Sequence, residues 1–557
     1  MLNEFIAQQT TILDQPLSLS SEHHNDLNKN MCNLENEIGQ SKKKFHIETY
    51  GCQMNESDSE IINSILSKAG YQYTKTLKSA DIVLMNTCAI REGAENRIWG
   101  RLSELRSLKT PSQQPIIIGV LGCMAERLKK KLLEKAKIVD LIAGPDAYRD
   151  LPQLLLALDG SSRSMNVQLS ADETYADIRP IRFRTDSPQA YVSIMRGCNN
   201  MCSFCIVPFT RGRERSRPID SILDEIKGLR DQGIKEITLL GQNVNSYHDR
   251  SEDSQTTPHE NTPGFKEMYK LRSGDGWRFE NLLEKAAEIA PEVRFRFTSP
   301  HPKDFPKPVL EIIRDFPNIC KYVHLPAQSG STSVLTRMRR NYSKEAYLGL
   351  VDNIREMIPE IALSTDMICG FCGESEEEFR ESIELIEKVR YDQAFLFAYS
   401  MREKTHAHRN YKDDVPEEIK LKRLREMIDL FLNIQEEITR KEIGRMHLVL
   451  VEGPSGEKYP GQWKGRTDTN KRVLIKQTDL EEIDKSFGKK GEKKEIKRGD
   501  YVLTYIEKTT RKSLFGKAVG KMSLREFAGM SGKKAFVDKE KTKQILKSFE
   551  CGIDFSL

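Results

Sequence analysis

Residues 196–205 read RGCNNMCSFC, so Cys198, Cys202 and Cys205 form a C-x3-C-x2-C run just after an apolar stretch, Tyr191–Met195, that predicts a strand. Three thiolates at this spacing can hold three irons of a [4Fe–4S] cluster, which leaves the fourth iron open to another ligand. The alternative is a structural zinc site. Zinc requires four protein ligands, and no fourth Cys or His stands near the run. The spacing therefore favours the iron–sulfur cluster.

The sequence from this run onward alternates short apolar strands with helices, which is typical of a parallel sheet. Six such βα units predict a partial or complete barrel, with its active site at the carboxyl ends of the strands. The predicted strands are Tyr191–Met195, Ile237–Leu240, Arg294–Thr298, Tyr322–Leu325, Ala362–Ile368 and Ala394–Tyr399, and the clearest helices are 218–232, 343–357 and 375–389. Residues 249–276, rich in Ser, Thr, Pro, Asp and Gly, interrupt this pattern and are interpreted as a surface insertion.

An open parallel α/β domain is predicted upstream of the barrel. Its candidate strands are the apolar runs 45–49, 81–86 and 116–121, and a helical pattern covers 57–69. Cys52, Cys88 and Cys123 follow the three runs and are 36 and 35 residues apart. Because open α/β sheets bind ligands at the carboxyl edge of their strands, this spacing favours a second three-cysteine cluster. The alternative is three buried cysteines, since free Cys is often buried.

The predicted secondary structure changes after the barrel. A long charged helix is predicted over 417–443, and five short strands follow it, which predicts a small β-barrel of the OB-like kind, a common RNA platform. Residues 440–557 hold 28 Lys and Arg against 17 Asp and Glu, so we expect an anionic partner there. The basic tail, 526–557, is expected to be loosely ordered.

Composition excludes several classes of protein. The 557 residues are 30% charged and 38% hydrophobic, as in ordinary soluble globular chains. No run approaches the ~20 apolar residues of a membrane helix. Eleven cysteines are too sparse for a disulfide scaffold, which favours a reducing compartment. Residues 1–43 are polar and read as a disordered leader, and the first 40 contain six acidic residues and no Arg, the reverse of a mitochondrial transit peptide.

Taken together, these motifs resemble the radical S-adenosylmethionine superfamily and, within it, the methylthiotransferase family of the MiaB type. The resemblance covers nearly everything from about residue 44 to 520. The matching stretches are ETYGCQMN (48–55), NTCAIR (86–91), GCMA (122–125), CIVPFTRGR (205–213), GQNVN (241–245) and HLPAQSG (324–330). Many bacterial members read GFPGE where this chain has GFCGE at 370–374, which resembles the branch that includes the animal mitochondrial enzyme.

The resemblance implies three domains: a methylthiotransferase domain over 44–160, a radical S-adenosylmethionine domain over 184–440 and a TRAM RNA-binding domain over 444–522. It implies a radical cluster on Cys198, Cys202 and Cys205, which would cleave S-adenosylmethionine to a 5′-deoxyadenosyl radical. An auxiliary [4Fe–4S] cluster on Cys52, Cys88 and Cys123 would hold the sulfur to be inserted. Gln242 and Glu374 are the residues we expect to contact S-adenosylmethionine.

The implied reaction converts N6-isopentenyladenosine, next to the tRNA anticodon at position 37, to its 2-methylthio derivative. The alternatives are threonylcarbamoyladenosine, a ribosomal-protein aspartate, and a non-enzymatic regulator that binds a partner protein. Retention of all six cysteines argues against the regulator. The expected partners are tRNA, an electron donor such as a flavodoxin or ferredoxin, and a sulfur donor. We expect a cytoplasmic monomer, with the mitochondrial matrix as the alternative compartment.

Weaker signals remain open. Ser299, His324, Gln328 and Asp366 lie at predicted strand ends, where they either hold a ligand or form turns. The arginines at 211, 213, 215 and 217 alternate at strand period, so they face either a phosphate backbone or solvent. Cys369 and Cys372 form C-x2-C, but no second pair is near to complete a metal site. The tryptophans at 99, 277 and 463 are interpreted as packing residues, with 463 a candidate base platform.

Overall fold

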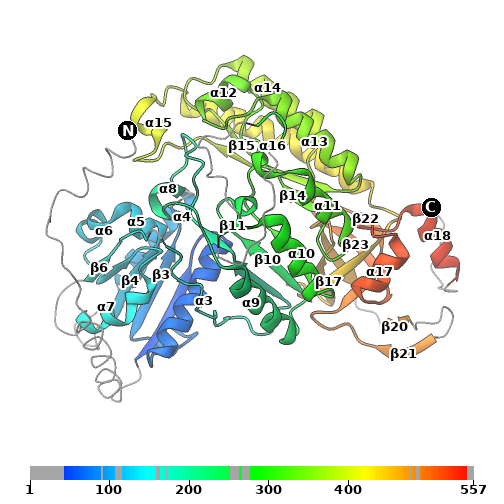
Figure 1. The fold of residues 1–557 in the computed structure, drawn as a ribbon, viewed down its shortest axis with the longest axis horizontal. Helices are drawn as coiled ribbons and strands as arrows, with labels where there is room; N and C mark the ends of the chain where they lie inside the picture. The colour runs from blue at the N-terminus through cyan, green and yellow to red at the C-terminus, as the bar shows by residue number, and fades with distance from the viewer. Residues whose placement is uncertain are drawn as a thin grey trace.

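The computed structural model describes residues 43–89, 92–106, 116–158, 164–170, 172–250, 262–265, 276–476, 480–483 and 490–548. The predicted leader, most of the predicted insertion and the end of the basic tail lie outside these residues. Three domains follow one another across the molecule, with the N-terminal domain at one end, the barrel in the middle and the C-terminal domain at the other end (Figure 1). Within the described residues, no helix is long and apolar enough to cross a membrane.

The N-terminal domain is an open parallel sheet, as predicted, but it has six strands in the described residues where three were predicted. The spatial order is β2-β1-β3-β4-β5-β6, so the direction of winding reverses between β1 and β3. The strands are β1 (Lys44–Thr49), β2 (Gln72–Tyr73), β3 (Ile82–Thr87), β4 (Ile117–Gly122), β5 (Leu141–Ala143) and β6 (Ser164–Asn166), and the helices are α3 (Gln53–Lys68), α4 (Glu92–Leu105), α5 (Cys123–Leu128), α6 (Lys130–Lys135) and α7 (Leu151–Leu158). Such a reversal opens a crevice at the carboxyl edge of the sheet.

The central domain is the predicted partial barrel. Two three-stranded parallel sheets, β7-β10-β13 and β14-β15-β16, are joined by a parallel bridge between Phe295 and Ile319. The strands are β7 (Gln189–Ser193), β10 (Glu236–Leu240), β13 (Arg294–Phe297), β14 (Tyr322–His324), β15 (Ala362–Cys369) and β16 (Gln393–Ala398). The main helices are α9 (Ile219–Asp231), α10 (Phe279–Ile289), α11 (Lys307–Asp315), α13 (Lys344–Met357), α14 (Glu376–Val389) and α16 (Glu417–Arg440). Their apolar faces and the outer faces of the strands form the largest core of the molecule.

The C-terminal domain is a closed five-stranded barrel. The strands β17 (Met446–Pro454), β18 (Gln462–Arg466), β19 (Arg472–Lys476), β22 (Tyr501–Thr509) and β23 (Leu514–Lys521) form its wall, and a β19–β23 pairing closes the ring. A hairpin of β20 (Leu480–Ile483) and β21 (Lys490–Lys494) extends from β23.

The basic tail differs from the prediction. Instead of a loosely ordered segment, it forms α17 (Leu524–Ser531) and α18 (Lys539–Ser548). Their apolar side chains, Leu524, Phe527, Ile545 and Leu546, are buried in one core with β17 and β22. The two helices were not predicted because the segment is rich in Lys and its apolar residues are few. A few apolar residues per helix are enough to pack each helix against the barrel.

The C-terminal domain seals the amino end of the central barrel. Arg294 and Arg296, on β13, both reach the C-terminal domain: Arg294 contacts β17 and the end of β18, and Arg296 contacts the turn between β18 and β19. The Arg296 guanidinium donates to the carbonyls of Thr467 at 2.7 Å and Asp468 at 2.8 Å. The Arg294 guanidinium donates to the carbonyls of Leu448 and Arg466. Among the described residues, this contact covers the amino end of the barrel and leaves the carboxyl ends of its strands for a ligand.

Candidate functional site

The first cysteine trio lies on one loop at the carboxyl end of the barrel. Cys198, Cys202 and Cys205 follow β8 (Met195–Arg196) and precede the short helix α8 (Val207–Thr210). The loop turns sharply at Gly197, where φ is +76° and a Cβ atom would lie 1.9 Å from the carbonyl oxygen of Arg213. No other residue fits there, so this glycine fixes the start of the loop.

Burial and mutual repulsion raise the pKa of the Cys198 thiol well above its usual value, and burial raises the pKa of Cys205 to about 12. Thiols with a raised pKa become thiolates beside a strong positive charge, and a bound metal centre supplies one. An arginine, Arg340, also reaches this trio: it donates to Cys202 Sγ at 3.4 Å. The donor set is thus suited to an iron–sulfur cluster.

The second trio gathers at the winding reversal of the N-terminal sheet. Cys52 follows β1 and caps α3, Cys88 follows β3, and Cys123 opens α5 directly after β4. The thiols come close together because their strands are neighbours in the order β1-β3-β4. A Cβ atom on Gly51 would lie 2.6 Å from Cys88 Cβ, so the first two loops are in contact.

The thiols of this trio differ in the direction in which their pKa values are shifted. A hydrogen bond with Cys88 lowers the pKa of Cys52 to about 6, and the nearby positive charge of Arg211 acts in the same direction. Burial raises the pKa of Cys123, although Arg211 Nε donates to its Sγ at 3.2 Å. Cys52 is exposed, whereas Cys88 and Cys123 are buried, so the trio opens outward on one side.

Side-chain amides hold the strand ends in register. Asn55 Nδ2 donates to Asn86 Oδ1 at 3.2 Å and to the Thr87 carbonyl at 3.0 Å, and its Oδ1 accepts from Cys52 Sγ at 3.2 Å. Asn86 Nδ2 donates back to the Asn55 carbonyl at 2.9 Å. The Thr87 hydroxyl donates to the Leu121 carbonyl at 2.6 Å, which ties β3 to β4. These bonds explain why polar residues stand beside Cys52 and Cys88 in otherwise apolar surroundings.

A buried carboxylate links the two trios. Asp58, on α3, accepts from Arg196 at 2.7 Å and from Arg211 at 2.7 Å, and all three side chains are at most 4% exposed. Arg196 directly precedes the first cysteine loop, and Arg211 donates to Cys123 of the second trio. The roles of Asp58 and Arg196 were not predicted from the sequence. The only signal was a charged residue on the apolar face of a predicted helix.

The alternating arginines were expected to face either a phosphate backbone or solvent. Three of the four do neither. Arg211, Arg215 and Arg217 are buried, and their guanidinium groups pair with Asp58, Asp146 and Glu225 respectively. Only Arg213 is exposed. The strand covers Arg215–Ser216 alone, so the period of two does not describe one face. Three of the four arginines join this segment to its protein neighbours.

Gln242 and Glu374 occupy different surroundings. Gln242 Oε1 accepts from the Gly197 amide at 2.6 Å, while its Nε2 is buried with no hydrogen-bond partner among the described residues. Glu374 accepts from the backbone amides of Gly370 and Phe371, and burial raises its pKa to about 7. Gln242 therefore touches the first cysteine loop, whereas Glu374 mainly shapes the turn after β15.

The inner face of β14–β16 is polar and partly open. His324 Nδ1 lies 2.8 Å from Ser364 Oγ, and its Nε2 lies 3.5 Å from an Asp366 carboxylate oxygen. The ring of Phe395, 45% exposed, packs edge-on against His324 with centroids 6.1 Å apart. Ser299 and Gln328 adopt positive φ, which fits their alternative interpretation as turn residues. The face offers a ligand both aromatic and hydrogen-bonding contacts.

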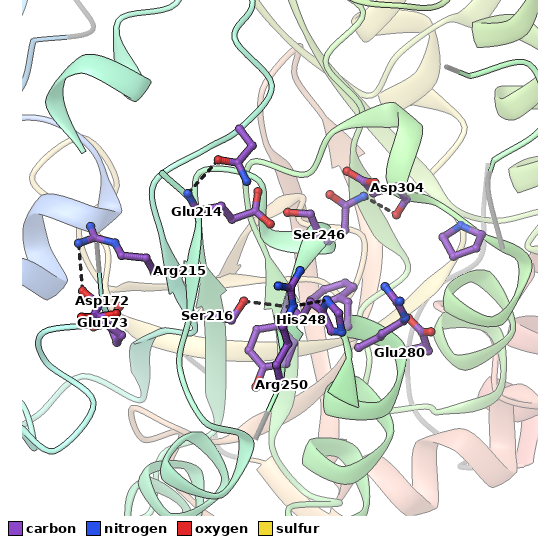
Figure 2. A pocket seen from close by; sticks show the side chains of 16 residues that line it. Asp172, Glu173, Glu214, Arg215, Ser216, Ser246, His248, Arg250, Glu280 and Asp304 are labelled. Carbon is purple, nitrogen blue, oxygen red and sulfur yellow. Dashed lines mark hydrogen bonds between the residues drawn. The ribbon is translucent and has the colours of Figure 1, made fainter. Parts of the chain in front are cut away.

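A cavity of about 480 Å³ lies beside the first cysteine loop. Figure 2 shows charges of both signs around it: Arg215 points toward Asp172 and Glu173 on one side, and Arg250 lies beside Glu280 on the other. Asn199 of the loop contributes to its wall and accepts from the Glu214 amide at 3.2 Å. None of the six cysteines, Gln242 or Glu374 lines the cavity. It is a neighbour of the cysteine site and not part of it.

The zinc alternative gains no support from the geometry. Within the described part of the chain, no three His, Cys, Asp or Glu side chains are arranged to hold a single metal ion. This includes the Cys369 and Cys372 pair, both of which are buried. Each trio instead combines three thiols with one arginine donor, which suits a larger, anionic cluster.

Comparison with known proteins covers all three domains. The family models that match are "Uncharacterized protein family UPF0004" at residues 44–144, "Radical SAM superfamily" at 192–386 and "TRAM domain" at 440–519. The mouse "Mitochondrial tRNA methylthiotransferase CDK5RAP1" is 51% identical over 87% of this chain and 82% of its own length. The "tRNA-2-methylthio-N(6)-dimethylallyladenosine synthase" of Chloroherpeton thalassium is 46% identical over 88% of this chain and 99% of its own length.

Proposed function

Because the chain belongs to the family of radical S-adenosylmethionine tRNA methylthiotransferases, we propose that it converts N6-isopentenyladenosine, next to the anticodon at position 37 of tRNA, to the 2-methylthio derivative. The observation that carries this proposal is the pairing of two cysteine trios through Asp58, which accepts from Arg196 at 2.7 Å and from Arg211 at 2.7 Å. One trio belongs to the radical domain and the other to the methylthiotransferase domain. Sulfur insertion into a C–H bond needs both a radical source and a sulfur carrier.

In this proposal Cys198, Cys202 and Cys205 hold the radical [4Fe–4S] cluster, and Cys52, Cys88 and Cys123 hold the auxiliary one. When bound, the two clusters and S-adenosylmethionine supply hydrogen abstraction from the aromatic ring and the methylthio group that replaces the hydrogen. The residues of the chain orient the reactants and exclude water. The C-terminal domain covers the amino end of the barrel. Substrates therefore reach the barrel from its carboxyl end, where both trios lie.

We assign S-adenosylmethionine contacts to Gln242 and Glu374. Gln242 is anchored by the amide of Gly197 and keeps one buried amide group without a partner, as a ligand-binding side chain does. Glu374 keeps a hydrogen-bonded position at the end of β15, and burial raises its pKa to about 7, so it can bind as an acid or as a base near neutral pH.

The C-terminal domain is the proposed tRNA platform, since the family model there is the TRAM domain and the region is rich in Lys and Arg. A flavodoxin or ferredoxin as electron donor and a separate sulfur donor complete the reaction, and the chain acts as a monomer. The names of the mammalian relatives contain the word "Mitochondrial", which supports the mitochondrial alternative for its compartment. The expectation of a cytoplasmic enzyme has no comparable support.

The substrate is tested with three tRNAs: unmodified, prenylated and threonylcarbamoylated. Reconstituted enzyme with S-adenosylmethionine and a reductant should add the methylthio group only to the prenylated tRNA, measured by mass spectrometry of the digested nucleosides. An apolar prenyl chain buried beside the base would contribute about 25 cal/mol per Å² to its positioning. Modification of the threonylcarbamoylated tRNA would refute the substrate but not the family, and modification of a ribosomal-protein aspartate would refute tRNA altogether.

The two-cluster assignment is tested by iron counting on anaerobic protein. Wild-type chain should hold about eight irons, and each triple Cys→Ala variant about four. Loss of the radical trio should abolish S-adenosylmethionine cleavage, whereas loss of the auxiliary trio should preserve cleavage and stop sulfur insertion. A wild-type count of about four irons would contradict the assignment.

A further inference from the structure

Each cysteine trio has one buried arginine that donates to one of its sulfurs. Arg211 Nε lies 3.2 Å from Cys123 Sγ, and the Arg340 guanidinium lies 3.4 Å from Cys202 Sγ. Both side chains are almost fully buried, at 3% and 5% exposed. Arginine stays protonated even when buried, so each trio has a permanent positive charge within hydrogen-bond distance.

The two arginines differ in origin. Arg340 follows α12 (Thr332–Arg337) in the same domain as its cysteine, and its other contacts are neutral: the Tyr342 hydroxyl at 3.1 Å and the Pro326 carbonyl at 3.0 Å. Arg211 belongs to the radical domain but serves a cysteine of the N-terminal domain. It directly follows α8, which packs against α5, the helix that Cys123 opens (Figure 1).

A second contact fixes the direction of the Arg211 side chain. Its NH2 group donates to Asp58 at 2.7 Å, while Nε points to Cys123. The planar guanidinium therefore has two of its donors committed to the N-terminal domain, which aims the charge at the sulfur. Arg196 holds the other oxygen of Asp58 at 2.7 Å, so the carboxylate cannot turn away. A lysine can carry the charge, but its ammonium lacks the planar fork that fixes the two directions.

We propose that Arg211 and Arg340 are positioning residues that set the reduction potentials of the auxiliary and the radical cluster separately, each through the cysteine sulfur it touches. This rests on the two-cluster part of the proposed function. Reduction adds a negative charge to a cluster. A fixed cation at a ligand sulfur stabilises the reduced form and raises the potential, as do hydrogen bonds to that sulfur. The N-terminal trio therefore takes part of its electronic tuning from the radical domain.

The test uses full-length, reconstituted protein and follows both clusters by electron paramagnetic resonance during a redox titration. The triple Cys→Ala variants assign each signal. Arg211→Met should shift the midpoint potential of the auxiliary cluster to more negative values and leave the radical cluster unchanged. Arg340→Met should do the reverse. Arg211→Lys, which keeps the charge, should bring the auxiliary potential part of the way back.

The outcomes separate this inference from the function it rests on. Iron counting comes first, and a wild-type count of about four irons refutes the two-cluster assignment whatever the arginines do. With about eight irons present, unchanged potentials in Arg211→Met or equal shifts of both clusters would overturn the inference. Loss of the auxiliary irons in Arg211→Met would also overturn it, because Arg211 would then hold the cluster site together through its buried ion pair with Asp58 instead of setting a potential.

Discussion

Replacing Asp58 with Ala tests whether the buried carboxylate joins the two domains. Asp58 is fully buried, and it is the shared partner of Arg196 and Arg211, each at 2.7 Å. Its removal leaves two guanidinium groups in the interior with their main counter-charge gone. Arg196 keeps a more distant carboxylate, Glu173 at 3.7 Å, and the ring of Tyr175, whereas Arg211 keeps chiefly the Cys123 sulfur.

Breaking one buried ion pair by removing a single partner costs about 3–5 kcal/mol, because a desolvated charge is left behind. We expect the Asp58→Ala change to fall in this range, since the two pairs share one carboxylate and do not add. With a urea m-value of about 2 kcal/mol/M, the unfolding midpoint of the N-terminal domain should fall by about 1.5–2.5 M. Asp224→Ala is the matched control. Asp224 pairs with Lys227 at the surface, and its side chain is 62% exposed. Its loss should change stability by at most about 0.5 kcal/mol.

The chain offers one tryptophan in each domain as a local probe. Trp99 packs on the N-terminal core, Trp277 on the barrel core and Trp463 on the C-terminal barrel. Three proteins that each retain a single tryptophan, the other two replaced by Phe, report the domains separately during urea unfolding. Multidomain chains do not unfold in two states, so midpoints are compared domain by domain.

The expected pattern is a large shift at Trp99, a smaller one at Trp277 and none at Trp463. A shift at Trp99 no larger than that of the Asp224 control would refute the coupling argument. So would an equal shift at all three tryptophans, because Asp58 has no contact with the C-terminal domain within the described residues.

Three further predictions concern the loop, the domain junction and the RNA platform. Gly197→Ala should remove about four of the eight irons, because its Cβ would meet the Arg213 carbonyl at 1.9 Å, whereas Gly228→Ala, with open space around it, should keep all eight. The ion pair with Lys471 holds the pKa of Glu442 well below 4.5. The contribution of this pair to the stability of the C-terminal domain is therefore present above pH 4.5 and is lost as the pH falls through the lowered pKa. The Trp463 unfolding midpoint should therefore fall with acid in the wild type and much less in Glu442→Gln. Reversing three exposed charges should lower the salt dependence of tRNA binding. The slope of the logarithm of the binding constant against the logarithm of the salt concentration should fall by about 0.7–0.9 for each phosphate that is no longer neutralised. The control, Lys227→Glu on α9, should leave this slope unchanged. The three changes are Lys476→Glu, Lys508→Glu and Lys512→Glu.

Local patterns in the chain were enough to predict the architecture and the positions of the six thiols. Strands with apolar runs and helices with a regular period depend on local patterns, so the boundaries of β10, β14 and α14 fall within a residue of the prediction. The positions of Cys52, Cys88 and Cys123 also followed from local order. Each cysteine stands closely after a strand, and neighbouring parallel strands bring their carboxyl ends to one edge.

The connection between the two trios depends on packing between domains and could not be predicted from local patterns. Asp58 lies 138 residues from Arg196 and 153 from Arg211, and no periodicity connects them. In the sequence, Asp58 is an unexplained charge on the apolar face of α3. Its partners, Arg196 and Arg211, come from another domain and meet it only in the folded protein. The same holds for the arginines at 211, 215 and 217, whose alternation predicted one exposed face, although three-dimensional packing placed each beside a different carboxylate. Which buried charges pair with each other depends on how the domains pack. Domain packing is a property of the folded chain and not of its local sequence pattern.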